Sequence, residues 1–325
     1  MEKHVVSLEM NGTEFSLETG RMAKQANGSC IVRMGDTMSL MTVTADKNPS
    51  DRDFLPLFVE YRNKTYAAGK IPGGFFKREA RPTERETLSA RLIDRPLRPL
   101  FPDGYRHETQ VVAFIISADT DFHADVLSIT GASAALALSD VPFHEIVSGV
   151  RVGRIEGEFV INPSVSQLEE SDLDLIVAGT DDIVCMIEGE CLEVSEDVLL
   201  DAIEFGHDWI KKLNALQRDL VAAAGAKEKW DYQSPVADDS QLVKVEELVG
   251  AELKTAMVTR GKFERSAAMS ALKDKVKAAF TDADGEVDGE AVAMFGKLEK
   301  QYLRTMILDE QVRSDGRDLT TVRPI

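Results

Sequence analysis

Residues 73–102 read GGFFKREARPTERETLSARLIDRPLRPLFP. This stretch holds seven basic side chains, four prolines, and two adjacent phenylalanines behind a pair of glycines, in a chain whose formal net charge is −18. Within residues 61–106, eleven lysines and arginines stand beside five acidic residues, a local charge of +6 in an otherwise strongly acidic protein. So uneven a distribution predicts an anionic partner for this stretch.

A helix is expected to begin inside the stretch. The run TERE at 83–86 matches the capping box, in which the threonine and the second glutamate bind each other's backbone N–H groups. Arg91 and Arg95 would share one face of this helix because they are four residues apart. Pro96 should end the helix, since proline lacks the N–H group that the helix needs. Arg98 follows directly after that break.

The tip before the helix carries the residue types of a site for single-stranded nucleic acid. Phe75 and Phe76 offer rings on which bases stack, while Lys77, Arg78 and Arg81 can neutralise phosphates. Arginine suits phosphate because its planar guanidinium donates two parallel hydrogen bonds. The alternative is structural: the helix arginines form surface ion pairs and the phenylalanines belong to the core. The glycines favour the nucleic-acid hypothesis for the tip, whereas both interpretations stay open for the helix arginines.

The first two thirds of the chain alternate between strands and helices. Hairpin turns are expected at Asn-Gly 11–12 and Gly-Asp 35–36, and residues 51–82 indicate mostly loop. Helices are expected over residues 125–139, where small side chains require close packing, and over residues 195–224. This order predicts an α+β domain at residues 1–226, with helices packed on antiparallel sheets.

The remaining third changes character after a polar, turn-rich linker at residues 227–240. Three segments of residues 241–310 carry apolar residues at helical spacing, without strand alternation. The sequence therefore predicts a small all-helical domain that spans residues 227–310 together with its linker. The tail, residues 311–325, is again typical of a strand and indicates the beginning of a further domain.

Composition excludes several classes of function. The three cysteines are odd in number and form no C-x-x-C pair, and the five histidines are scattered without metal-ligand spacing. A structural zinc site is therefore not expected, and a reducing, cytoplasmic setting is favoured. No apolar run approaches the length of about 20 residues that spans a bilayer. The acidic balance argues against nonspecific coating of nucleic acid.

The sequence resembles bacterial polynucleotide phosphorylases. The resemblance rests on the stretch above and on ITGASAALALSDVPF, VRVGRIEGEFVINPS and LDLIVAGTDDIVCMIEGE, and it covers essentially the whole chain. It implies a first RNase PH-like core at residues 1–226, an all-helical domain at 227–310, and the truncated start of a second core at 311–325.

The resemblance also implies an activity. Members of this family degrade single-stranded RNA from its 3′ end by phosphorolysis, with inorganic phosphate as co-substrate and Mg²⁺ as cofactor, and release nucleoside diphosphates. They form homotrimers, some within an RNA-degradation complex, and have no membrane association. Their Phe-Phe-basic loop lines the entrance of the RNA channel, a role that carries over to Phe75, Phe76, Lys77, Arg78 and Arg81. Residue 77 is lysine where the family commonly has arginine.

No catalytic or metal-binding residue is expected in this chain. The family's active site lies in the second core, which would bind the Mg²⁺, and it uses a serine run, two aspartates and a lysine. His123, Ala124 and Asp125 stand in place of the serine run here, and Ile176 stands in place of the lysine, which leaves only Asp174.

Asp172 and Asp174 share a strand face with no cation near them in sequence. Two hypotheses follow. The chain is the RNA-channel and trimer-forming part of a phosphorolytic exoribonuclease, or it is a noncatalytic RNA-binding and oligomerisation module in its own right.

Overall fold

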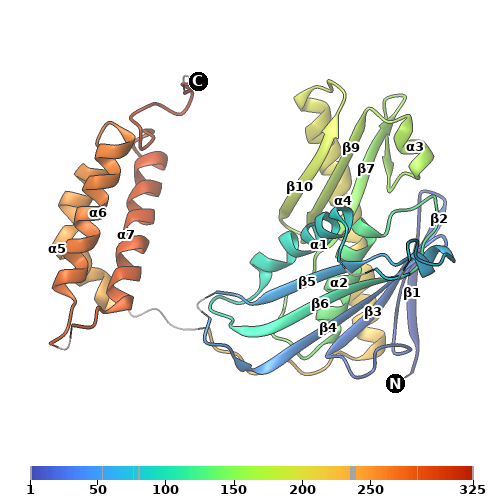
Figure 1. The fold of residues 1–325 in the computed structure, drawn as a ribbon. Helices are drawn as coiled ribbons and strands as arrows, with labels where there is room; N and C mark the ends of the chain where they lie inside the picture. Colours follow the sequence, from blue (N-terminus) through green and yellow to red (C-terminus); the bar gives the residue numbers. More distant parts are fainter. Residues whose placement is uncertain are drawn as a thin grey trace. The chain divides into compact units, whose positions relative to one another are not determined.

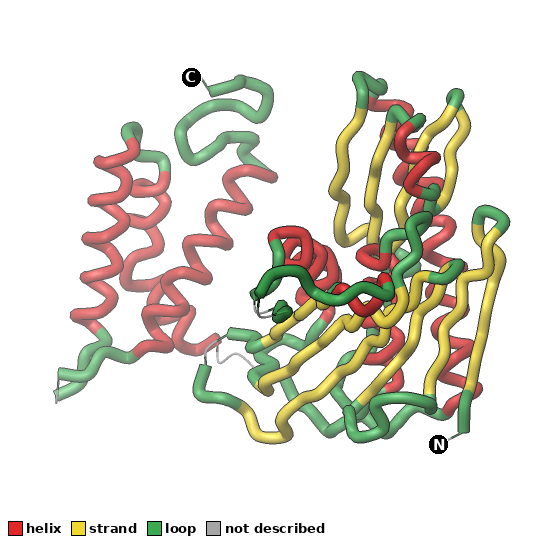
Figure 2. Tube along the Cα trace, turned by 45° about the vertical axis from the view of Figure 1, so that its right-hand side comes forward, coloured by secondary structure: helices red, strands yellow, loops and turns green. Residues whose placement is uncertain are grey.

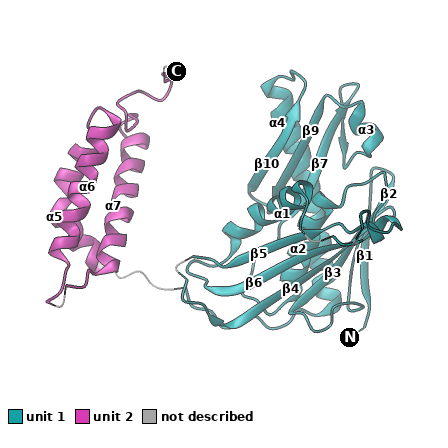
Figure 3. Ribbon diagram, in the orientation of Figure 1, with its two compact units in different colours: residues 1–235 teal, residues 236–325 magenta. Residues whose placement is uncertain are grey.

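The computed structural model describes residues 2–52, 54–75, 77–79, 81–234, 239–283 and 285–323. Two compact units divide the chain, residues 1–235 and residues 236–325 (Figure 3). Each unit has its own cluster of buried apolar side chains. None of the described helices combines the length and the apolar character that crossing a bilayer requires.

A six-stranded sheet runs in the order β1-β2-β3-β4-β6-β5 (Figure 1). Its strands are β1 (His4–Met10), β2 (Thr13–Thr19), β3 (Gly28–Met34), β4 (Thr37–Pro49), β5 (Leu57–Arg62) and β6 (His107–Ser117). The two predicted hairpins are confirmed, because Met10 pairs with Thr13 and Met34 pairs with Thr37 across two-residue turns. Neighbouring strands are antiparallel, except that β5 lies parallel to β6.

The described part of residues 51–82 is mostly loop, as predicted, but two short elements in it were not predicted. The segment contains β5 and a 3₁₀ turn, η1 (Thr65–Ala68). β5 has only six residues, and its partner β6 begins 45 residues after β5 ends. Because the pairing that stabilises a short edge strand is non-local, the periodicity of the segment itself gives a weak signal.

Helix α1 (Glu84–Leu97) begins where the capping box predicts. The Thr83 hydroxyl accepts a hydrogen bond from the N–H of Glu86, and the Glu86 carboxylate accepts one from the N–H of Thr83. The expected stop at Pro96 is wrong, because Pro96 lies inside the last turn. Proline removes a single N–H group there, and the N–H of Arg98, two residues further on, still bonds to the carbonyl of Asp94. The 3₁₀ turn η2 (Arg98–Leu100) then ends the segment.

A four-stranded antiparallel sheet in the order β10-β9-β7-β8 completes the first unit. Its strands are β7 (Ser148–Ile155), β8 (Glu158–Ile161), β9 (Leu173–Gly179) and β10 (Val184–Cys191). The helices of this part are α2 (Ala124–Leu138), the short α3 (Val165–Glu169) and α4 (Glu196–Ala224). Ser195 caps α4 as predicted, since its side chain accepts from the N–H of Val198.

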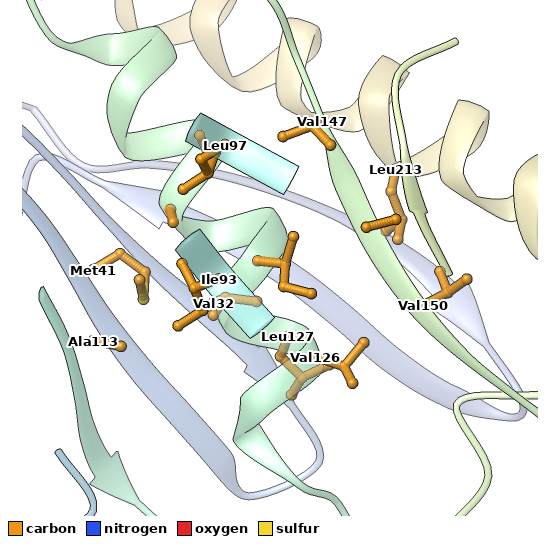
Figure 4. Packing of buried hydrophobic residues seen from close by; sticks show 14 of the residues in the cluster. Val32, Met41, Ile93, Leu97, Ala113, Val126, Leu127, Val147, Val150 and Leu213 are labelled. Atoms are coloured by element: carbon orange, nitrogen blue, oxygen red, sulfur yellow. The ribbon is translucent and has the colours of Figure 1, made fainter. Parts of the chain in front are cut away.

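Helix α2 forms the centre of the first unit. All 15 of its residues are buried, and Figure 2 shows helices lying against the strands of both sheets. Val32 and Met41 of the larger sheet approach α2 from one side, and Val150 of β7 approaches it from the other (Figure 4). A Cβ atom added to Gly131 would lie 2.9 Å from Cγ1 of Val32. The small side chains of α2 therefore permit the close packing that the sequence predicts.

Residues 227–234 pack on the surface of the first unit, although the sequence predicts that they belong to a polar, turn-rich linker. The ammonium group of Lys229 donates to the carbonyls of Leu136 and Ser139, both at 2.8 Å, at the end of α2. The N–H of Trp230 donates to the carbonyl of Asp140 at 2.9 Å. A lysine at this position suits the end of a buried helix, where backbone carbonyls lack partners within the helix.

The second unit contains the three helices expected in residues 241–310. They are α5 (Asp239–Met257), α6 (Lys262–Ala279) and α7 (Gly289–Leu308). Val249, Leu253 and Phe295 belong to their common core. The strand-like reading of the tail is wrong for its described residues 311–323, which contain no strand. There, one carboxylate oxygen of Asp318 accepts from two backbone N–H groups, at 2.8 and 2.6 Å, and so favours turns.

Candidate nucleic-acid interface

The loop before α1 exposes the tip that the sequence singles out. The Phe75 side chain is 93% exposed, and Lys77, Arg78 and Arg81 are exposed as well. Lys77 has a φ of 48°, a left-handed conformation that turns the backbone sharply at this point. Phe76 lies outside the described residues, and its predicted role remains a prediction. The described part of the tip therefore places one aromatic ring and three cations in solvent.

Two glutamates, Glu79 and Glu86, connect the chain that follows Phe75 to residues 63–65, which precede it. At the far end of the tip, the carboxylate of Glu79 accepts from the N–H of Thr65 at 2.9 Å, and Lys64 donates to the carbonyl of Glu79 at the same distance. At the start of α1, Glu86 accepts from the N–H groups of Thr83 and Asn63 at 2.7 and 3.0 Å.

The Glu86 carboxyl is held ionised by these contacts. Burial opposes its ionisation, but the hydrogen bonds from Thr83 and Asn63 outweigh burial and lower the pKa of the carboxyl. A charged, buried anchor therefore fixes the base of the loop at neutral pH, while the tip extends beyond it.

Two of the predicted helix arginines differ in their surroundings. Arg91 is exposed, and among the described residues it forms no ion pair. Arg95, which shares its face, forms an ion pair with Glu188 of β10. A phosphate could therefore bind Arg91 directly, but it would have to compete with Glu188 for Arg95.

Arg98 is used within the fold. Its guanidinium makes two hydrogen bonds to the carboxylate of Asp94, at 2.7 and 2.9 Å, and donates to the carbonyls of Leu55 and Leu57. These contacts connect the end of α1 to the start of β5. The bidentate geometry expected for phosphate is thus already taken up by a carboxylate, and the RNA role of Arg98 remains a prediction.

A second group of charged residues gathers where α2 begins. His123 precedes the helix, and its Nδ1 lies 2.8 Å from the guanidinium of Arg85 of α1. Because a guanidinium can only donate, Nδ1 must accept, which requires a neutral ring protonated on Nε2. Burial lowers the pKa of His123, and Arg85 acts in the same direction while Asp125 opposes it.

Arg151 of β7 joins the two aspartates of this group. Its guanidinium donates to Asp174 of β9 at 2.9 Å and to Asp125 at 3.4 Å. The expectation that Asp174 has no cation nearby holds only along the sequence, since the pairing of β7 with β9 brings Arg151 to it. Burial raises the pKa of Asp174, an effect that Arg151 opposes and Asp125 reinforces.

The carboxylates of this group do not fit a divalent cation. Arg151 already supplies positive charge to both Asp125 and Asp174, and Arg154 pairs with Asp172 at 2.7 Å. Among the described residues, no three histidine, cysteine, aspartate or glutamate side chains are placed to hold a metal ion. A Mg²⁺ ion here would have to displace an arginine from each carboxylate that it bound.

These ion-pair partners could not be predicted from local sequence patterns. Arg151 and Arg154 lie in the alternating strand VSGVRVGRI, where an arginine is ordinarily a solvent-facing residue. Gly153 is directly opposite Asp174 in the sheet, which places Arg151 and Asp174 diagonally on one face. Only the register between strands about 20 residues apart could have revealed this pairing.

Comparison with known proteins agrees with this architecture. Residues 12–142 match the 3′ exoribonuclease family, domain 1, and residues 145–208 match domain 2 of the same family. Residues 242–318 match the polyribonucleotide nucleotidyltransferase RNA binding domain. The chain belongs to the polyribonucleotide nucleotidyltransferase family.

Two relatives illustrate the extent of the similarity within this family. The polyribonucleotide nucleotidyltransferase of Chlorobaculum tepidum is 50% identical over 97% of this chain, and that of Bacillus velezensis is 45% identical over all of it. In both cases the alignment covers 46% of the relative, so the chain spans about half the length of the curated relatives it matches.

A solved structure supports the fold. Rice (Oryza sativa) Rrp46 superimposes with a TM-score of 0.50 at 14% sequence identity, over 67% of this chain and 93% of the rice chain. At this identity the likeness concerns the fold alone, and it supports the RNase PH-like core.

Proposed function

We propose that the chain guides single-stranded RNA within an enzyme that degrades RNA from its 3′ end by phosphorolysis and releases nucleoside diphosphates. The observation that carries the proposal is the exposed tip, where Phe75 stands in solvent beside Lys77, Arg78 and Arg81. Stacking on an aromatic ring combined with neutralised phosphates is the usual chemistry of single-strand binding. Phe76, Arg91, Arg95 and Arg98 complete the proposed surface.

The chain itself would contribute no catalytic group. Phosphorolysis requires donors that hold the attacking phosphate and positive charge that stabilises the transition state. At the start of α2 the donor position carries Asp125, whose carboxylate would repel phosphate, and Arg151 is engaged by Asp125 and Asp174. Inorganic phosphate and Mg²⁺, which the resemblance implies, would then bind outside these residues.

Assembly belongs to the same proposal. A homotrimer would bring three copies of the exposed tip around one RNA strand, and the whole protein would act in the cytoplasm within a larger RNA-degrading complex. The second candidate function is a noncatalytic RNA-binding and oligomerisation module, which the ion pairs of Arg151 with Asp125 and Asp174 favour because they leave neither of these two carboxylates free.

RNA binding by variants of the tip tests the proposal. Replacing Phe75, Phe76, Lys77 and Arg78 by alanine should weaken binding of a labelled oligouridine, because each stacked base contributes about 1–3 kcal/mol. The dependence of the dissociation constant on salt should also flatten, because phosphate contacts are lost. A folded quadruple variant with the affinity and salt dependence of the unsubstituted chain would show that the tip is structural.

A further inference from the structure

The turn between α5 and α6 exposes a second aromatic ring beside cations. Phe263, in the first turn of α6, is 82% exposed. Arg260, Gly261 and Lys262 precede it directly, and all three are exposed. Gly261 has a φ of 94°, a conformation that residues with a side chain rarely adopt, so the backbone turns sharply here. The turn thus presents a ring and two cations on one short segment.

The two cations are available, whereas their neighbour Arg265 is not. Among the described residues, neither Arg260 nor Lys262 forms an ion pair with an acidic group. Arg265 donates to the carbonyls of Thr259 and Ser314, at 3.4 and 3.0 Å. Its bonds tie the start of α6 to the tail and thereby hold the exposed turn in a defined place.

Charge favours an anionic ligand at this turn. Residues 236–325 carry a net charge of −3, against −15 for residues 1–235. The second unit therefore repels an anion far less than the first does. At the turn itself Glu264 adds one negative charge to the two positive charges of Arg260 and Lys262, so the segment is positive.

The chemistry of the turn repeats that of the tip before α1. In both places a glycine with positive φ lies beside an exposed phenylalanine and two cations: Gly74, Phe75, Lys77 and Arg78 in the first unit, and Gly261, Phe263, Arg260 and Lys262 in the second. A protein partner would need a contiguous apolar patch, but among the described residues within about ten positions of Phe263 in the sequence, Val258 is the one other large exposed apolar residue.

We propose that Arg260, Lys262 and Phe263 form a second contact site for single-stranded RNA, with Phe263 stacking on a base and the two cations binding phosphates. This inference rests on the proposed function, and it goes beyond the match of residues 242–318 to an RNA binding domain because it names the residues of one turn that would contact the RNA. It adds particular residues of one turn to the binding surface and leaves the role of the tip before α1 unchanged.

The test measures binding of a labelled single-stranded oligouridine to the 325-residue chain at several salt concentrations. Phe263→Ala should weaken binding at least about fivefold, and Phe263→Trp should retain it because tryptophan also stacks. The double variant Arg260→Ala/Lys262→Ala should flatten the salt dependence by about 1.4 in the slope of log affinity against log salt, about 0.7 for each lost phosphate contact.

A matched control separates contact from general charge. Lys244 and Lys273 are exposed lysines away from the turn, and Lys244→Ala/Lys273→Ala removes the same two charges. The control should retain the affinity and slope of the unsubstituted chain, with circular dichroism showing that every variant is folded. Equal losses in control and turn variants would overturn the inference, because the effect would then be nonspecific.

The remaining outcomes distinguish this inference from the proposed function. If alanine variants of Phe75, Lys77 and Arg78 weaken binding while Phe263→Ala and Arg260→Ala/Lys262→Ala do not, the second site is wrong and the proposed function stands. If the unsubstituted chain does not bind single-stranded RNA at all, both are wrong. If the variants of the turn alone weaken binding, the second site stands and the role of the first tip falls.

Discussion

The guanidinium of Arg151 bridges Asp174 on β9 and Asp125 at the start of α2, at 2.9 and 3.4 Å. Arg151 and Asp125 are nearly buried, with side-chain exposures of 13% and 12%. One cation thus neutralises two carboxylates at the positions that correspond, by the resemblance, to the serine run and an aspartate of the family's second core. Loss of Arg151 would remove this cation from both carboxylates, whereas loss of one aspartate would leave Arg151 paired with the other.

Replacing Arg151 should therefore destabilise the first unit strongly. Arg151→Met keeps most of the side-chain volume but leaves Asp125 and Asp174 without a cation. Removing one partner of a buried pair leaves an uncompensated charge, and we expect a loss of about 2–4 kcal/mol in the free energy of unfolding. Denaturation by urea, followed by circular dichroism, measures it. A loss below about 1 kcal/mol would mean that solvent already screens the two carboxylates.

Replacing Asp174 should have a much smaller effect, with a definite dependence on pH. Because the folded protein raises the pKa of Asp174 above its ordinary value of 3.8, the folded state holds its proton more tightly than the unfolded state does. The stability that this group contributes is therefore lost as the pH rises from below 3.8 to above the raised pKa of the folded state. Asp174→Asn removes this loss, so its stability relative to the unsubstituted chain should improve from acidic to neutral pH. A constant difference across that range would contradict the raised pKa.

Burial should lower the pKa of His123 below its ordinary range, and Arg85 should lower it further. Since the folded protein lowers the pKa of His123, the unfolded state binds a proton that the folded ring does not, and stability falls as the pH drops below about 6.5. Arg85→Met removes both the donor to Nδ1 and a nearby positive charge, so the pKa of His123 should rise. Nuclear magnetic resonance titration of the imidazole reports it. An unchanged pKa would show that burial alone sets the value.

Two glycine substitutions should change stability in opposite directions. A Cβ atom at Gly28 would lie 2.0 Å from the backbone carbonyl oxygen of Ala135 in α2, so Gly28→Ala must push β3 away from α2. We expect a loss of at least about 1–3 kcal/mol from overpacking. Gly296 lies within α7 with nothing near its Cβ position, and Gly296→Ala should stabilise the second unit by up to about 1 kcal/mol. Thermal unfolding of the two variants checks both signs.

Local features of the fold were readable from the sequence. The turn at 11–12, the capping box at Thr83 and Glu86, and the N-cap at Ser195 each depend on residues a few positions apart, and each was found as predicted. The three helices of the second unit follow equally from their spacing of apolar residues. β5 was not predicted because it pairs with β6, which lies far along the chain.

The candidate site likewise contains residues that the local sequence predicts and ion-pair partners that it does not. Residue types alone pointed to Phe75 and the cations after it, since exposure of a glycine-flanked aromatic is a local property. The partners of Arg95, Arg98 and Arg151 depend on how β10, β5 and β9 pack around them, which no spacing in the sequence shows. The exposed ring at Phe263 was overlooked because an aromatic in a helical period ordinarily faces the core.

Diphosphate release tests the central claim most directly, namely that this chain guides RNA without cleaving it. The purified 325-residue chain would be incubated with poly(A), inorganic phosphate and Mg²⁺, beside the full-length Chlorobaculum tepidum relative as a positive control. The account predicts that the chain binds the polymer and releases no diphosphate above background. Release at a rate near that of the relative, abolished by Asp174→Ala, would contradict it and make the first core catalytic.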